Sequence, residues 1–536
     1  MLNMASQILS SVVVCAVLTV LLVVAKSTAV DSSANCPCNE ALINRGGFPD
    51  GFLFGAASSA YQIEGAYNEN GKGFNMWDNF THAYPDKIRN GTNGDVAVDS
   101  YHLYKDDVQI IKDTGLDAYR ISISWARILP GGTISKGVNQ DGVDYYNNLI
   151  NELLAIGVEP FVTMFHFDTP QALEDAYGGF LSSQIVVDFE AYAELLFRKF
   201  GDRVKYWITV NEPWCLGKFG YANGIFAPGR CSEWMGRNCV GGDSATEPYI
   251  VIHNQLLAHA TVAKLYRTKY QESQKGKIGL SANTFWFLPY NETDENIKAK
   301  DRVLDFMFGS IMDPITFGRY PESMRMRIGS RLPQFTKEEA DMVKGSYDFV
   351  GLNYYSGMYA LDDPTTSSNL SFTTDFGATL TGLRDGVPLG DHGSIFSRYY
   401  TYPKGFREIL RYIKEKYNDP LIYITENGID ETRDDSLSLS EALKDFKRKE
   451  YIYDHLCCLR EAIEKDGVNV KGYFVWSLTD NFGWSGGYST RFGLYYIDFN
   501  DKLLTRHPKY SSLWLKYILG EKMGRRPGTG SRISDQ

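Results

Sequence analysis

The sequence predicts a single (β/α)8 TIM barrel of the α/β class, with elaborated loops after its strands. Three observations predict this fold: eight short apolar, β-branched runs, helical patterns between most of them, and polar or aromatic clusters after almost every run. The 536 residues exceed the usual length of one domain, but barrels with insertions run past roughly 400 residues. Because no repeat or long linker divides the chain, we expect one barrel over residues 30–520.

The eight runs are the predicted strands. They are Phe52–Ser58, Asp117–Trp125, Glu159–Phe167, Tyr206–Pro213, Lys277–Trp286, Asp348–Ser356, Leu421–Gly428 and Val470–Leu478. Apolar residues recur at helical spacing in Ser100–Thr114, Val143–Ile156, Ser183–Phe200, Glu247–Tyr270, Phe406–Tyr417 and Ser440–Lys465. Several of these segments end in glycine, at Gly115, Gly157, Gly201 and Gly467, as helices commonly do. Alternating strands and helices imply parallel pairing, in a closed barrel or in a doubly wound open sheet.

The strand ends favour the closed barrel. Polar or aromatic clusters follow most strands: Gln62 to Glu64, His166, Asn211-Glu212, Asn353 to Tyr355, Glu426-Asn427 and Trp476 to Asp480. In a barrel the C-terminal ends of all strands surround one mouth, where enzymes of this fold carry their chemistry. In an open sheet the same side chains would spread along an edge. We therefore expect one active site at one end of the barrel.

The composition excludes two classes of partner. A formal net charge of −10 makes nucleic acid and anionic membrane surfaces unattractive partners. Basic residues do gather within residues 521–536, but among Gly and Ser, so we expect a disordered, solvated tail there. Aromatic residues form 14 % of the chain, which hints at surfaces that stack on carbohydrate, although core packing accounts for most of them.

The N-terminal residues predict export. An apolar run from Ile8 to Ala25, followed by Lys26 and small residues, indicates a signal peptide over residues 1–29. The run is long and no basic residue precedes it, so an uncleaved anchor is the alternative. Glycosylation sequons begin at Asn79, Asn90, Asn291 and Asn369. We expect a glycoprotein of the secretory pathway, extracellular or in vacuoles or protein bodies, and free of the membrane after cleavage.

Two of the eight cysteines are predicted to form a disulfide. Cys231 and Cys239 bracket a short glycine-containing loop that could close in an oxidising compartment. Cys15 would leave with the signal peptide. Seven cysteines then remain, so at least one thiol is unpaired or pairs with another chain.

The remaining cysteines carry no metal signature. Cys457 and Cys458 lie in a helical pattern and are interpreted as free, partly buried thiols. Cys36 and Cys38 lack a second ligand pair nearby, and the histidines show no metal-like grouping, so neither a metal nor a cofactor is expected. The sequence leaves the pairing of these four cysteines and of Cys215 open.

Glu212 and Glu426 are the candidate catalytic pair. Each follows an apolar strand, where burial would normally exclude a charge. Glycoside hydrolysis requires two carboxyl groups across the scissile bond, one that donates a proton and one that attacks the anomeric carbon. The ends of the fourth and seventh strands of a barrel can face each other across its mouth. On spacing alone, two glutamates in surface loops are an equal alternative.

The segments around these glutamates carry a family resemblance. Asn211-Glu212-Pro213 and Ile424-Thr425-Glu426-Asn427-Gly428 resemble the two catalytic signatures of glycoside hydrolase family one. Further matches, in the family's order, cover nearly the whole mature chain: Phe52-Leu-Phe-Gly-Ala-Ala-Ser58, Tyr61-Gln62-Ile63-Glu64-Gly65, Tyr119-Arg120, Ser124-Trp125, Gly351-Leu352-Asn353-Tyr354-Tyr355 and Trp476 through Gly493. The resemblance implies a plant retaining β-glycosidase that acts on a small glycoside, and it leaves homo-oligomerisation open.

The resemblance also implies a role for each matching residue. Glu426 would attack C1, and Glu212 would protonate the leaving oxygen and then activate water. Arg120 and Tyr355 would orient Glu426, with Asn353 in support. The substrate would be bound by Gln62, His166, Asn211, Tyr355, Trp476, Gly483, Trp484 and Phe492. A core histidine and a barrel-filling tryptophan are the alternative readings of His166 and Trp476.

Two departures from the family affect substrate recognition. Phe167 stands where the family has Trp, which removes an indole N–H that donates to a sugar hydroxyl. Gly483 stands where the family has a Glu that binds the 4- and 6-hydroxyls of glucose. The change removes a charge-assisted hydrogen bond worth about 1.5–3 kcal/mol and opens space beside O6.

Gly483 therefore bears on substrate size. Plant family members that release an intact disaccharide, of the vicianin hydrolase and primeverosidase type, need room there for a second, 6-linked sugar. We predict such a diglycosidase for secondary-metabolite β-glucosides, for example cyanogenic or aromatic ones, with an ordinary β-D-monoglucosidase as the alternative. A catalytically silent sugar-binding barrel and a transglycosidase are the alternatives of another class. Measuring hydrolysis against transfer to an alcohol with a reporter glycoside distinguishes the hydrolase, the silent barrel and the transglycosidase.

Overall fold

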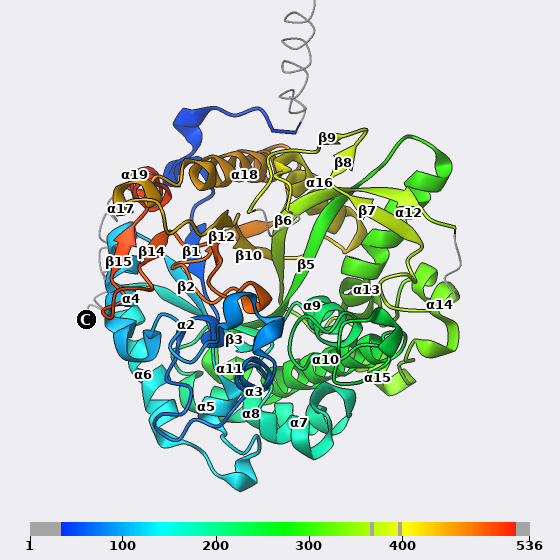
Figure 1. Ribbon diagram of the computed structural model, residues 1–536, viewed down its shortest axis with the longest axis horizontal. Helices are drawn as coiled ribbons and strands as arrows, with labels where there is room; N and C mark the ends of the chain where they lie inside the picture. The colour runs from blue at the N-terminus through cyan, green and yellow to red at the C-terminus, as the bar shows by residue number, and fades with distance from the viewer. Residues whose placement is uncertain (1–33, 365–368, 395–398, 521–536) are drawn as a thin grey trace, which may run out of the picture.

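The structure, a computed structural model, confirms the closed barrel. It describes residues 34–364, 369–394 and 399–520, so the predicted signal peptide (1–29) and tail (521–536) lie outside the described residues. The parallel strands follow chain order around the barrel (Figure 1): β1 (Leu53–Ala57), β2 (Ala118–Ser122), β3 (Glu159–Phe165), β4 (Tyr206–Asn211), β5 (Lys277–Pro289), β6 (Phe349–Asp362), β10 (Ile422–Asn427) and β12 (Val470–Trp476). Parallel pairing of β6 with β10 and of β12 with β1 closes the sheet and excludes the open alternative.

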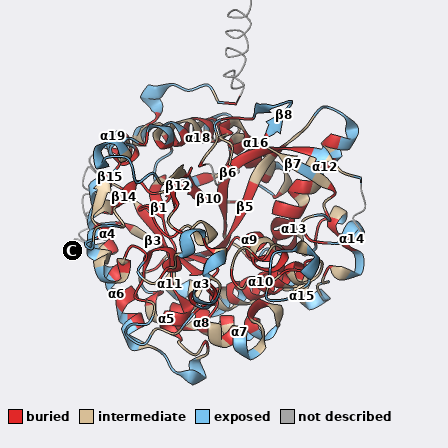
Figure 2. Ribbon diagram, in the orientation of Figure 1, coloured by how far each residue is buried: buried red, intermediate tan, exposed pale blue. Residues whose placement is uncertain are grey.

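Aromatic side chains fill the inside of the barrel. The Phe161 ring stacks on Tyr206, with centroids 4.1 Å apart, and meets the Phe474 ring at 4.7 Å. Tyr423 packs against Phe161 and Phe349 from the opposite wall. The strands are buried almost throughout (Figure 2), because helices cover the outer face and these side chains occupy the inner one. Packed side chains therefore fill the barrel interior beneath the C-terminal strand ends.

The predicted helices form between the strands. They are α4 (Ser100–Thr114), α6 (Gln140–Ala155), α8 (Gln184–Phe200), α10 (Glu247–Leu265), α16 (Pro403–Lys416) and α18 (Phe446–Glu464). Gly115, with φ of 80°, ends α4 in the left-handed conformation that glycine adopts most readily. Gly201 also follows its helix directly, but with an ordinary helical φ of −70°.

The helix predicted over Ser440–Lys465 is broken in two. A four-residue helix, α17 (Leu439–Ala442), precedes α18, and Asp445 between them has non-helical backbone angles. The Asp445 carboxylate accepts hydrogen bonds from the backbone N–H and the hydroxyl of Ser511, at 2.8 and 2.5 Å. Ser511 belongs to α19 (Tyr510–Leu519), so a contact with a distant helix overrides the local helical pattern.

The sequence analysis predicted no helix between β5 and β6, and the first two of the helices found there are joined directly. They are α12 (Asp294–Leu304) and α13 (Ser310–Phe317), joined by a π-helical turn over Asp305–Gly309. The wider turn shifts the apolar positions away from a period of 3.6 residues, and Pro314 lies inside α13. The helical period is therefore interrupted twice within one connection.

Strands β5 and β6 continue past their predicted ends. They stay paired as far as Pro289 and Ala360, and β7 (Ala378–Thr381) adds to β6 in antiparallel orientation. Figure 1 shows this extension rising from the barrel beside α12. The extended strands form a taller wall on one side of the barrel mouth.

The structure corrects the interpretation of four cysteines. Cys457 and Cys458 are not free thiols: Cys36 pairs with Cys458 and Cys38 pairs with Cys457, across 422 and 419 residues. The two bridges fasten the N-terminal segment to α18, and no local pattern could reveal partners so distant in sequence. The predicted Cys231–Cys239 disulfide is confirmed. Among the described residues Cys215 is the free cysteine.

The export prediction stays a prediction. Asn79, Asn90, Asn291 and Asn369 are all exposed, so each sequon is sterically open to modification. Within the described ranges, we find no helix with the length and apolar character needed to cross a membrane.

The paired disulfides predict a non-additive loss of stability. Replacing Cys36 and Cys458 by Ser, or Cys38 and Cys457 by Ser, should lower Tm little, because the remaining bridge still closes almost the same loop. Replacing all four should lower the free energy of unfolding by about 2–5 kcal/mol. Thermal unfolding of the three variants measures this. If the stability losses of the two double variants summed to the loss of the variant without all four cysteines, the prediction would be contradicted.

Candidate active site

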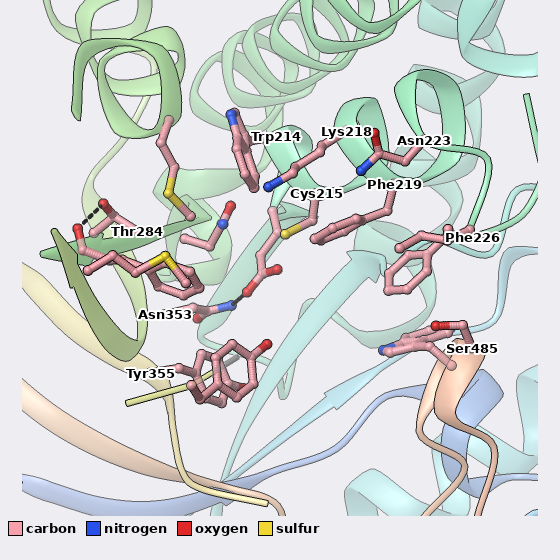
Figure 3. A pocket seen from close by; sticks show the side chains of 18 of the residues that line it. Trp214, Cys215, Lys218, Phe219, Asn223, Phe226, Thr284, Asn353, Tyr355 and Ser485 are labelled. Carbon is pink, nitrogen blue, oxygen red and sulfur yellow. Dashed lines mark hydrogen bonds between the residues drawn. The ribbon is translucent and has the colours of Figure 1, made fainter. Parts of the chain in front are cut away.

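A cavity of about 840 Å³ opens at the C-terminal ends of the barrel strands (Figure 3). Most of the predicted site residues line it: Gln62, His166, Asn211, Glu212, Asn353, Tyr355, Glu426, Trp476, Gly483, Trp484 and Phe492. Arg120 is the exception, because it lies fully buried beneath the cavity floor. Side chains from β2, β4, β6, β10 and β12 and from three loops thus meet at one place.

Glu426 is held by two donors. It lies in β10, and its carboxyl oxygens accept hydrogen bonds from Arg120 Nη1 at 2.5 Å and from the Tyr355 hydroxyl at 2.6 Å. Arg120 comes from β2 and Tyr355 from β6, so donors from opposite sides of the barrel fix one side chain. The buried guanidinium offsets the charge of a carboxylate that is itself only 3 % exposed.

Glu212 directly follows β4 in a left-handed backbone conformation, with φ of 45°. Its carboxyl oxygen Oε1 accepts a hydrogen bond from Asn353 Nδ2 at 2.7 Å. Burial and, next, the negative charge of Glu426 raise the pKa of Glu212 to about 7, and the Cys215 thiol, Asn353 and the charge of Arg120 limit the rise. Near neutral pH this group is therefore divided between its acid and base forms.

Asn353 and Asn211 join the two carboxyl groups into one network. Asn353 Nδ2 also approaches Asn211 Oδ1 at 3.1 Å, and the same oxygen accepts from Arg120 Nη2 at 2.7 Å. The Thr425 hydroxyl donates to Asn353 Oδ1 at 2.6 Å and accepts from Ser281 at 3.0 Å. This relay turns the amide nitrogen of Asn353 toward Glu212.

The sequence analysis missed Ser281 and part of the role of Thr425. Thr425 was visible only as a member of a family signature, and Ser281 carried no signal because it lies inside an apolar strand. Their contact joins β5 to β10 through the barrel interior. Hydroxyl groups at inward-facing positions of the two strands were the available clue.

Three rings form one side of the cavity. The His166 ring lies nearly parallel to those of Trp476 and Trp484, with centroids 5.7 and 6.0 Å away. Burial, and then the charge of Arg120, lower the pKa of His166 well below its ordinary value, so the imidazole is neutral. Flat, uncharged faces next to hydrogen-bonding groups suit a pyranose ring, which has both apolar and hydroxyl-bearing surfaces.

Gln62 ties the first strand end to the last loop. Its amide nitrogen donates to Phe482 O at 2.7 Å and to Asn481 Oδ1 at 3.1 Å, and its amide oxygen accepts from Ser59 at 2.6 Å. Asn481 was not among the predicted site residues. The loop that carries Gly483 is thereby fixed against the glycone side of the cavity.

Gly483 lines the cavity with its backbone in a tightly closed loop. Its N–H donates to Gly487 O at 2.7 Å. A Cβ at this position would lie 3.0 Å from both Gly487 O and the Thr490 hydroxyl. A larger residue here therefore requires a small shift of Thr490 or of the loop. Phe167, the other departure from the family, lies 5.5 Å from the Trp484 ring and keeps the wall aromatic.

The outer half of the cavity is mostly apolar, and the sequence analysis did not identify it. Aromatic and methionine side chains line it, namely Trp214, Phe219, Phe226, Phe285, Phe287, Phe306, Met307, Met358, Phe372 and Phe376. Figure 3 shows Trp214, Phe219 and Phe226 around its rim with Lys218 between them. The high aromatic content of the sequence was the only clue, because these residues come from short helical segments, loops and the outer parts of β5 and β6, whose convergence depends on the fold.

The sequence profile described as glycosyl hydrolase family 1 matches residues 44–523. The chain belongs to glycosyl hydrolase family 1. It is accordingly a retaining O-glycosyl hydrolase. For this family 1 enzyme, no group of three or more His, Cys, Asp and Glu side chains within the described segments could hold a metal ion.

The family 1 enzyme has similar relatives among plants. It is 55 % identical over 500 residues to β-glucosidase 12 of Oryza sativa subsp. indica, covering 93 % of this chain and 96 % of the relative. Raucaffricine-O-β-D-glucosidase of Rauvolfia serpentina is 52 % identical over 530 residues, covering 95 % and 97 %. A crystal structure of rice Os3BGlu6 β-glucosidase superposes with a TM-score of 0.87 at 48 % identity, covering 89 % of this chain and 99 % of that chain. In another structure, a mutant of that rice enzyme carries covalently bound glucose.

The coupling between the two glutamates gives a direct prediction. Glu426→Gln should lower the pKa of Glu212 by on the order of one unit, because a like charge is removed while burial stays. Carbon-13 NMR titration of labelled glutamate carboxyl groups measures the value, and Glu212→Gln identifies the signal. Glu408→Gln, on outer helix α16, is the control and should leave the titration unchanged. An unaltered pKa in Glu426→Gln would refute the coupling.

Proposed function

We propose that this enzyme hydrolyses β-glucosides, with Glu426 as nucleophile and Glu212 as general acid and base. The network of Arg120, Asn211 and Asn353 carries the proposal, because it holds one carboxyl group beside a buried cation and the other at a pKa of about 7. Two carboxyl groups with different environments meet the requirement of glycoside hydrolysis for an attacking and a protonating group.

In the first step Glu426 attacks C1 of the glucose from one face. The bond from C1 to the aglycone oxygen breaks, and the proton of Glu212 passes to that oxygen. Arg120 and Tyr355 hold the attacking carboxylate in one orientation. Asn211, which accepts from Arg120, presents its amide nitrogen on the glycone side, where it approaches the His166 ring.

In the second step water replaces the aglycone. Glu426 is then esterified and carries no charge, which removes one cause of the raised pKa of Glu212. The ionised Glu212 takes a proton from water as the water oxygen attacks C1 and the ester bond breaks. Covalent glucose on the rice relative is consistent with such an intermediate.

The outer cavity favours a large apolar aglycone. Its wall of aromatic and methionine side chains can bury a rigid hydrophobic group. The volume of the whole cavity, about 840 Å³, is near the upper end of the range for small-molecule sites. Two relatives have names that specify such substrates, a raucaffricine glucosidase and a furostanol glycoside 26-O-β-glucosidase of Hellenia speciosa. We infer that this enzyme acts on a secondary-metabolite glucoside.

The division of roles predicts contrasting variants. Glu426→Gly should abolish hydrolysis and recover turnover with azide, yielding the glycosyl azide of inverted configuration, because a small anion can occupy the vacated side. Glu212→Ala should retain far more activity on aryl glucosides with good leaving groups than on alkyl glucosides, which need protonation. Product analysis and kcat/KM on both substrate types measure this.

The same assays test the pH dependence. Because Glu212 must be protonated in the first step, kcat/KM should fall as pH rises through about 7, and this limb should vanish in Glu212→Ala. Identical behaviour of the Glu212 and Glu426 variants would show that the roles are assigned wrongly.

We further propose that the preferred glycone is a 6-O-glycosylated glucose, released as an intact disaccharide. Gly483 supports this, because it places no carboxylate beside O6 and lines the cavity only with backbone. A glutamate there would meet the 6-substituent and lose its own hydrogen bonds, so its absence is a means of gaining specificity. An ordinary β-monoglucosidase is the competing reading, and it is the activity after which the relatives are named.

Substrate size can be tested at this one position. The enzyme should show a higher kcat/KM for a 6-O-pentosylglucoside than for the matching glucoside, and Gly483→Glu should reverse the preference by about 10-fold or more, corresponding to 1–3 kcal/mol. Gly483→Ala introduces the same crowding against Thr490 without the carboxylate and is the matched control. Preference of the unaltered enzyme for the simple glucoside, or removal of the pentose first, would refute disaccharide release.

A further inference from the structure

Three cationic side chains line the cavity, and the reaction proposed above uses none of them. They are Arg89, Lys218 and Arg237. The carboxyl groups among the described lining residues are those of Glu212, Glu426 and Asp430. Because the whole chain has a formal net charge of −10, its composition does not account for three cations along one cavity.

The three carboxyl groups already have other roles. Glu212 and Glu426 form the proposed catalytic pair. Asp430 is only 2 % exposed, and it accepts hydrogen bonds from the Ser394 N–H at 3.1 Å and from the Ser394 hydroxyl at 2.5 Å. The apolar outer half of the cavity therefore has cations along it, with no further carboxylate among its described lining residues.

Lys218 lies on the wall that would contact the leaving group. It follows Glu212 in the chain, in the π-helical turn Leu216–Ala222. Its Nζ is 4.5 Å from the centroid of the Trp214 ring and 5.2 Å from that of the Phe219 ring, and Figure 3 shows the side chain extending toward Trp214. The ammonium is thus half-buried on an aromatic surface, where a charge acts more strongly than in bulk water.

Arg237 continues this positive region along the rim. It lies in the loop that the Cys231–Cys239 disulfide closes. Its Nη1 donates to Asn223 O at 3.4 Å, and Asn223 ends the π-helical turn that carries Lys218. In the described part of the chain Arg237 donates to this backbone oxygen and to no carboxylate. Its charge is therefore not neutralised by an acidic neighbour.

Arg89 belongs to the next segment of the rim. Lys87 Nζ donates to Arg237 O at 3.0 Å, so the two segments are in contact. A Cβ at Gly487 would lie 2.9 Å from Arg89 O, so the same segment also packs against the loop that carries Gly483. Lys218 thus marks the aglycone side of the rim and Arg89 the side of O6, with Arg237 between them.

We propose that the aglycone carries an anionic group, such as a carboxylate, which Lys218 binds and which Arg237 and Arg89 attract into the cavity. The proposal rests on the β-glucosidase function proposed above and specifies its substrate class. An apolar body with a charged edge would place its rings against the aromatic wall and its anion against the ammonium. Cations along a cavity with walls of low dielectric also raise the local concentration of an anionic substrate.

A matched pair of substrates isolates the charge. 4-(Carboxymethyl)phenyl β-D-glucoside and 4-(carbamoylmethyl)phenyl β-D-glucoside have nearly the same size, and the methylene group insulates the leaving phenolic oxygen from the charge. The ratio of kcat/KM for the acid to that for the amide therefore cancels the chemistry and the recognition of glucose. We expect this ratio to be above one for the unaltered enzyme.

Changing the charge of Lys218 should change this ratio. Lys218→Gln should lower it about fivefold, Lys218→Glu should reverse the preference, and Lys218→Arg should keep most of it. Arg237→Gln should lower it about twofold, because that side chain is exposed. Lys112→Gln, at the exposed end of outer helix α4, removes the same charge outside the cavity and is the matched control.

Ionic strength gives a readout that a structural role would not change. Because salt screens charges, raising it from about 0.01 M to about 0.5 M should lower the ratio for the unaltered enzyme and for Lys112→Gln, but much less for Lys218→Gln. Thermal unfolding of each variant, and its turnover of the amide, separate loss of fold from loss of charge recognition.

Three results would overturn the proposal. If the unaltered enzyme hydrolyses the acid no faster than the amide, or if Lys218→Gln and Lys112→Gln give the same ratio, Lys218 only covers the Trp214 ring. A larger loss in Arg89→Gln than in Lys218→Gln would place the anion on the side of O6. If neither glucoside is hydrolysed, the proposed β-glucosidase function fails instead, whereas hydrolysis of the amide with an unresponsive ratio refutes only the anionic aglycone.

Discussion

Two carboxyl groups share one buried site, and the cost of ionising both at once governs its construction. Burial and the charge of Glu426 together raise the pKa of Glu212 to about 7. A single buried guanidinium, that of Arg120, is hydrogen-bonded directly to Glu426, whereas its hydrogen-bond link to Glu212 runs through Asn211 and Asn353. This unequal sharing of one cation places chemically identical side chains in different electrostatic environments, as the proposed reaction requires.

The barrel produces this asymmetry because strand register fixes which side chains lie at the same level of the barrel interior. Glu426 and Asn353 are register partners on β10 and β6, and Asn211 and Ser281 are register partners on β4 and β5. Hydrogen bonds run around the barrel from Ser281 through Thr425 to Asn353. A slip of one strand by one residue would turn these groups from the inside to the outside, so closure of the barrel and geometry of the site are the same constraint.

Sequence reasoning was accurate where the information is local. Each of the eight strands coincides with a short apolar run of the sequence. The two glutamates proposed as the catalytic pair lie in signatures of a few residues, and the structure brings both to one cavity. Contacts between distant segments were not readable: Asp445 breaks a helix because of Ser511, and Cys457 pairs with a cysteine 419 residues away. The apolar half of the cavity was also not predicted, because its residues come from short helical segments, loops and strand ends that are too short to show a period.

The two bridges between the N-terminal segment and α18 have a topological consequence. Together with the chain from Cys36 to Cys458 they form a covalent ring that contains every barrel strand except β12. Within the ring, Tyr451 on α18 donates to the backbone oxygen of Tyr355, whose own hydroxyl holds Glu426. A protease that cuts one surface loop inside the ring releases no fragment, so both pieces stay covalently joined around the cavity that holds Glu212 and Glu426.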